Sequence, residues 1–177
     1  MKFTLSIALL ATACSAAVPI TTFKLKTVSA NSEINGKTFN AAQSKIFTNM
    51  QNQNANCQHG TQDDATFQLR EGKLTLYATK AAPQQVYAQT TTAEQGKMGY
   101  IRPGHELPPG GTLDGWAIDG SGHLKISGVG FVACPGAGQG AWAIYADVGH
   151  HDGCLKIEAE AVNEPRPLSC YYTEVEN

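Results

Sequence analysis

Cysteine and histidine side chains, which can bind metals or act as nucleophiles, meet in one short stretch of this chain. Residues 134–154 read CPGAGQGAWAIYADVGHHDGC, so Cys134 and Cys154 frame a glycine-rich turn, an aromatic run and His150-His151-Asp152. Thiolate and imidazole groups together bind transition metals such as zinc. The same two cysteines could instead form a disulfide that closes a β-hairpin.

The number and spacing of the cysteines favour the disulfide. Cys14 lies in an N-terminal segment that we expect to be removed, which leaves Cys57, Cys134, Cys154 and Cys170. An even number of cysteines in a secreted chain indicates two disulfides, with three connectivities open. Zinc sites use close cysteine pairs, whereas 76, 19 and 15 residues separate these cysteines. We therefore expect no metal or other cofactor, and we favour Cys134–Cys154 with Cys57–Cys170 without excluding the other pairings.

Other polar groups could in principle perform acid–base catalysis, yet none lies in a setting that favours it. His105-Glu106, with Arg102 and His123, resembles the set that small secreted ribonucleases use, but a proline- and glycine-rich loop leaves its geometry free. Ser121 lies in Asp-Gly-Ser-Gly, which is typical of a turn. His150-His151-Asp152 is typical of a solvated loop. We predict that the protein is not an enzyme.

Aromatic side chains are the remaining candidates for binding. Trp116, Tyr100 and Tyr87 could form a platform on which sugar rings stack, as they do in carbohydrate-binding modules of the β-sandwich type. Packing into the core is the more common role for any single ring of this kind. Both alternatives stay open here, and these three residues are the candidate glycan contacts.

The N-terminus sets the compartment in which these residues would act. Lys2, the apolar run Leu5–Ala13 and the small residues that follow are typical of a signal peptide over residues 1–17, although a lipoprotein signal at Cys14 is an alternative. No later segment is long and apolar enough to cross a membrane. Without Lys2, the chain carries 12 basic and 15 acidic residues and no basic stripe, so we expect no nucleic-acid partner.

The elements that must position these residues are short strands. Alternation in Thr22–Val28 and the Glu71-Gly72 turn in TFQLREGKLTLYA lead a series of about ten strands. Residues 18–177 are therefore predicted to form one all-β domain, a β-sandwich or a partly open barrel with two disulfides. We expect Leu155–Ala161 to be a strand, and residues 93–111 a long loop around one short strand. The Asn- and Gln-rich stretch at residues 44–60 is expected to be a surface loop.

Several pieces of sequence, taken in order, resemble a known family. The segments GWAIDGSGHLKISGVGFVACPG, WAIYADV, GCLKIEAEAV and CYYTE resemble the four-cysteine C-terminal domain of the Pir mannoproteins. They are still more similar to the PhiA-like family of small secreted fungal cell-wall proteins. The resemblance covers about residues 57–174 and is strongest over residues 115–162.

This resemblance implies a secreted, extracellular structural protein of the fungal cell wall with a part in conidium or wall development. It also implies a wall polysaccharide, β-glucan or chitin, as the partner, and we expect a monomer. The chain departs from the Pir pattern because it lacks the N-terminal glutamine-containing repeats through which Pir proteins attach to glucan. The alternatives are a small secreted hydrolase or an effector aimed at a host molecule.

Overall fold

The computed structural model describes residues 22–175. The predicted signal peptide, residues 1–17, lies outside that range, and within the range no helix is long and apolar enough to cross a membrane. The strands are β1 (Thr22–Val28), β2 (Phe39–Ala42), β3 (Lys45–Thr48), β4 (Asn56–Cys57), β5 (Thr66–Arg70), β6 (Lys73–Leu76), β7 (Gln85–Gln89), β8 (Met98–Ile101), β9 (Gly111–Thr112), β10 (Trp116–Ile118), β11 (Leu124–Ile126), β12 (Phe131–Cys134), β13 (Trp142–Ala146), β14 (Leu155–Asn163) and β15 (Cys170–Tyr171).

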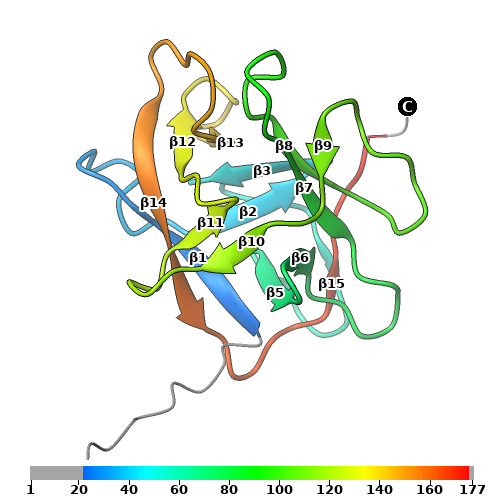
Figure 1. The fold of residues 1–177 in the computed structure, drawn as a ribbon. Coiled ribbons are helices and arrows are strands. Elements are labelled where there is room, and N and C mark those ends of the chain that lie inside the picture. Colours follow the sequence, from blue (N-terminus) through cyan, green and yellow to red (C-terminus); the bar gives the residue numbers. More distant parts are fainter. Residues whose placement is uncertain (1–21, 176–177) are drawn as a thin grey trace, which may run out of the picture.

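One large antiparallel sheet forms most of the molecule (Figure 1). Its strand order is β13-β12-β14-β1-β5-β6-β7-β8-β3-β2, with β9 on β7. A further pairing between β13 and β3 brings the two ends of this path together, so the sheet forms a ring that is not a true barrel. Two small sheets, β10-β11 and β4-β15, complete the fold. The prediction of an all-β protein with two disulfides is confirmed.

Local sequence explains the hairpins and the long strand. Glu71 and Gly72 join β5 to β6 with φ values of 50° and 75°, as a two-residue hairpin turn of the primed type requires. The stretch predicted as a strand from Leu155 is β14, which pairs with β1 on one side and β12 on the other. Residues 93–111 form a loop region around β8, as expected.

The interior of the ring is a single apolar core. Alternate residues of β1 point inward, so Phe23, Leu25 and Thr27 are buried while their neighbours are partly exposed. Trp142 and Ile144 on β13 are buried in the same way. Strands from the N-terminal and C-terminal parts of the described residues, β1 and β14, both contribute to this core.

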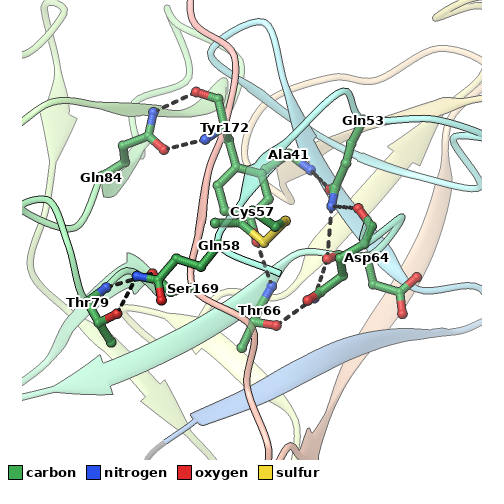
Figure 2. Close-up of a disulfide and its surroundings, with 12 residues drawn as sticks. Ala41, Gln53, Cys57, Gln58, Asp64, Thr66, Thr79, Gln84, Ser169 and Tyr172 are labelled. Atoms are coloured by element: carbon green, nitrogen blue, oxygen red, sulfur yellow. Dashed lines mark hydrogen bonds between the residues drawn. A yellow bond between two sulfur atoms is a disulfide. The ribbon is translucent and has the colours of Figure 1, made fainter. Parts of the chain in front are cut away.

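The prediction for residues 44–60 is wrong in part. Lys45–Thr48 is β3, the strand that pairs with β2, β8 and β13, and Gln53 is fully buried. Gln53 Oε1 accepts a hydrogen bond from the Ala41 N–H at 3.0 Å, and its Nε2 donates to the carbonyl oxygens of Gln62 and Asp64 at 2.7 and 2.9 Å (Figure 2). A buried glutamine thus pairs backbone groups that the strands leave free, and composition alone does not reveal such a role.

Candidate functional site

An open groove with a volume of about 960 Å³ lies on the described part of the molecule. It lies where β3, β8 and β13 meet. It is also lined by β7, the loop after β8 and the C-terminal segment, residues 170–175. This volume lies within the usual range for sites that bind small ligands. Residues from widely separated parts of the sequence therefore form one concave surface.

Tyr87 takes its position in the groove from the glycine opposite it. Tyr87 on β7 pairs with Gly99 on β8, and Gly99 pairs in turn with Lys45 on β3. A Cβ atom at Gly99 would lie 2.7 Å from the Tyr87 hydroxyl and 2.4 Å from the carbonyl oxygen of Ser44. Only glycine leaves room for the tyrosine ring to lie across β8. The ring is half-buried, and this burial raises the pKa of Tyr87 above its ordinary value.

Charged and polar side chains line the same groove. Lys45 and Lys97 are exposed at the groove, and Lys97 Nζ lies 3.6 Å from the Glu94 carboxylate. His105 and Glu106 line the groove from the loop after β8. Tyr145 on β13 adds a second partly exposed ring. The groove therefore combines flat aromatic surface with charges of both signs.

The C-terminal segment forms part of the groove and is firmly attached. Glu174 accepts hydrogen bonds from Arg102 Nε at 2.7 Å and from Gln84 Nε2 at 2.5 Å. The Glu174 carboxylate raises the pKa of the Arg102 guanidinium. The Tyr100 hydroxyl donates to the carbonyl oxygen of Thr173, and the Ser44 N–H donates to the same oxygen at 3.0 Å. These contacts position Glu174 and Val175 beside the groove.

Tyr172 anchors this segment in the core (Figure 2). The Gln84 amide accepts from the Tyr172 N–H and donates to the Tyr172 carbonyl oxygen, each at 2.9 Å, as a neighbouring strand would. The Tyr172 hydroxyl accepts the Thr66 N–H at 3.1 Å. Burial raises the pKa of Tyr172 to about 12. The disulfide Cys57–Cys170 then ties the segment to β4, because the two cysteines lie directly opposite each other.

The second disulfide, Cys134–Cys154, closes the stretch at residues 134–154 that contains the histidine pair. A ring nitrogen of His151 and the two sulfur atoms all lie within 4.8 Å of one another. Two sulfurs joined in a disulfide are not thiolate ligands, so this oxidised arrangement is a covalent cross-link. His150 is exposed and lies 2.7 Å from the Asp152 carboxylate.

Two of the three candidate glycan contacts are buried. Trp116 is 2% exposed and Tyr100 is 0% exposed, because both rings point into the core. Trp116 stacks on Phe131 with ring centroids 6.3 Å apart, and its Nε1 is buried without a hydrogen-bond partner. Neither ring offers a face to a ligand in solvent. Tyr87 and Tyr100 both line the groove, and of these two only Tyr87 is partly exposed.

The structure separates the groups that resembled a catalytic set. Arg102 is engaged with Glu174, and His105 and Glu106 line the groove. His123 lies outside the groove, beside β14, with its Nδ1 3.8 Å from the Glu158 carboxylate. The tip of the β10-β11 hairpin is a turn around Ser121, in which the Asp119 carboxylate accepts the backbone N–H groups of Ser121 and His123. These hydrogen bonds lower the pKa of Asp119.

Comparison with known proteins establishes the family. A family model described as "PhiA-like secreted protein" matches residues 23–173, which include all of β1 but its first residue, both disulfides and the groove up to Thr173. The chain belongs to the PhiA-like secreted protein family. Cell wall protein phiA of Aspergillus fumigatus is 35% identical over 181 residues, covering 98% of each chain. Its counterpart from Aspergillus niger is 35% identical over 92% of this chain and 95% of the relative.

A third relative is also similar along nearly the whole sequence. Cell wall protein phiA of Emericella nidulans is 31% identical over 98% of this chain and 100% of the relative. No solved structure matches the chain. This PhiA-like chain is thus a secreted fungal cell-wall protein.

Proposed function

We propose that this PhiA-like protein binds a polysaccharide of the fungal wall in the groove and acts without catalysis. The observation that carries the proposal is the position of Tyr87, whose ring lies across Gly99 in an open groove. A ring that lies along a surface offers a flat apolar face, and the sugar rings of β-linked glucans and chitin stack on such faces. The polar side chains around it, among them Lys45 and Glu106, are placed to hydrogen-bond sugar hydroxyls.

A non-catalytic role fits the arrangement of the acid–base groups. Arg102 and Glu174 neutralise each other, and His123 lies on a different part of the surface. A role in conidium or wall development, and the use of either β-glucan or chitin, are part of the same proposal.

The test is co-sedimentation of the mature protein with insoluble β-1,3-glucan and, in a separate arm, with chitin. We expect the wild type to bind one of the two and Tyr87→Ala to bind about 2- to 12-fold more weakly, since an aromatic contact contributes about 0.5–1.5 kcal/mol. Tyr87→Phe should bind as the wild type does, because it keeps the ring. Tyr77→Ala is the matched control, because Tyr77 is also half-buried but lies outside the groove.

Two results would contradict the proposal. One is a lack of binding to both polysaccharides, or equal binding by wild type and Tyr87→Ala. The other is release of soluble sugar that Glu106→Gln abolishes, which would make the protein a hydrolase instead.

A further inference from the structure

The Cys134–Cys154 disulfide lies where a β-ladder keeps its two cysteines together. Ala133 on β12 pairs with Leu155 on β14, which places Cys134 opposite Cys154 with Cα atoms 4.2 Å apart. Because the ladder between β12 and β14 does not depend on the cross-link, opening the disulfide would leave two thiols next to each other. This corner lies at the end of the sheet where the loops around β13 emerge (Figure 1).

His151 completes a set of three metal-binding side chains at this corner. One of its ring nitrogens lies within 4.8 Å of both sulfur atoms. Its Nε2 lies 2.8 Å from the carbonyl oxygen of Val148, and its ring packs against Tyr145 with centroids 5.8 Å apart. Histidine ligands of metals commonly donate one ring N–H to a backbone carbonyl while the other nitrogen binds the ion. Donation from Nε2 to Val148 leaves Nδ1 as the free nitrogen.

The surroundings allow this disulfide to be opened and its sulfurs to separate. Both cysteines are half-buried, whereas in the other disulfide only Cys57 is half-buried and Cys170 is 2% exposed. The segment after Cys134 contains Gly136, Gly138 and Gly140, all at positive φ, and its residues are exposed. We therefore expect a reductant to open Cys134–Cys154, which the exposed glycine-rich loop flanks, before Cys57–Cys170.

We propose that reduction converts this corner into a site for Zn²⁺ or a similar thiophilic cation. An external dithiol transfers two electrons and two protons to the disulfide, so that it becomes a disulfide itself and Cys134 and Cys154 become thiols. The cation then displaces the two thiol protons and binds both sulfurs and His151 Nδ1. Water takes the fourth position of the tetrahedral site that zinc prefers with such ligands. Reduction thus exchanges a covalent cross-link for a metal cross-link between the same strands.

The experiment uses the full mature protein reduced by a limiting amount of phosphine, which competes for the metal less than a thiol does. Alkylation and peptide mapping identify the opened disulfide, which we expect to be Cys134–Cys154 alone. Opening of Cys57–Cys170 first would overturn the proposal, because the proposal requires Cys134–Cys154 to be the disulfide that a reductant opens in the folded protein. The oxidised protein serves as the reference.

Cobalt(II) then reports the ligands directly. We expect the reduced protein to bind one equivalent with a thiolate-to-cobalt charge-transfer band, and Zn²⁺ to abolish the band by displacement. His151→Asn should weaken binding by about tenfold or more, as loss of a ligand requires. His150→Asn is the matched control, because His150 is exposed and contacts Asp152 instead. A lack of the band in the reduced wild type, or equal weakening by the two variants, would overturn the site.

This inference is independent of the proposed polysaccharide binding. Its readout is spectroscopic and needs no sugar, and neither cysteine nor His151 lines the groove. Loss of sugar binding in Tyr87→Ala would leave the cobalt signal intact, so each proposal can fail alone.

Discussion

Replacing Tyr172 with phenylalanine removes one oxygen atom from the centre of the molecule. Tyr172 is 0% exposed, and its hydroxyl accepts the backbone N–H of Thr66, which is itself buried. The phenylalanine ring would occupy nearly the same space, so the apolar packing around it would be kept. The change therefore isolates a single hydrogen bond between the C-terminal segment and β5.

The cost follows from what the Thr66 N–H loses. No water can replace the hydroxyl at a fully buried position, and a buried donor left unpaired costs about 1–3 kcal/mol. For a domain of this size each kcal/mol shifts the melting temperature by about 2–4 °C, so Tyr172→Phe should melt about 2–12 °C below the wild type. The free energy of unfolding should fall by the same 1–3 kcal/mol.

Urea unfolding and calorimetry of the mature protein measure both quantities. Tyr171→Phe is the control, because Tyr171 is the chain neighbour of Tyr172, is half-buried, and has its hydroxyl 3.5 Å from Glu174 Oε1. Its stability should stay within about 0.5 kcal/mol of the wild type. The reasoning is refuted if Tyr172→Phe also stays within that margin, or if both variants lose the same amount.

Three further predictions rest on other parts of the fold. Because burial raises the pKa of Tyr172 from 10.0 to about 12, its contribution should be complete below pH 10 and fall by about 1.4 kcal/mol per pH unit as pH rises toward 12; urea unfolding should show this loss as a fall in the stability of the wild type in excess of that of Tyr172→Phe, which keeps the raised pKa values of Tyr87 and Tyr100, and parallel curves would contradict it. Gly99→Ala places a Cβ 2.4 Å from the Ser44 carbonyl oxygen and should cost about 1–3 kcal/mol in thermal unfolding. Gly120→Ala meets nothing within 4 Å and should be near neutral; equal stability of the two variants would count against the packing argument. Replacing both cysteines of a disulfide with serine should cost about 3 kcal/mol for Cys134–Cys154, which spans 20 residues, and more for Cys57–Cys170, which spans 113; the reverse order in denaturant titrations would contradict the loop-length reasoning.

Side-chain alternation allowed much of the strand content to be predicted. The pattern in β1 and the Glu71-Gly72 turn depend on neighbours in sequence, so they can be identified without knowing the partners. Residues 44–60 looked like a loop because of their Asn- and Gln-rich composition, and β3 at the N-terminal end of this stretch was missed. Gln53 gave no local signal of burial, because its hydrogen-bond partners are backbone groups brought to it by other elements.

The candidate site was much less predictable. Alternation assigns Trp116 and Tyr87 each to one face of its strand. It does not say whether that face points into the core or toward solvent. The groove is lined by β3, β7, β8, β13 and the C-terminal segment. These elements extend from residue 45 to residue 175, so no single stretch of sequence contains the site. Whether an aromatic ring is buried or exposed depends on how the whole sheet closes, so it could be assigned only from the tertiary structure.

The sequence by itself determined the β class, the main hairpins, the secretory character and the family, because each depends on residue type, local order or similarity along the chain. Tertiary structure alone decided that Trp116 and Tyr100 belong to the core, that Tyr87 lies across Gly99, and that His151 stands beside Cys134–Cys154. The physical reason is that burial and contact depend on the closure of the ring, which pairs strands far apart in the chain.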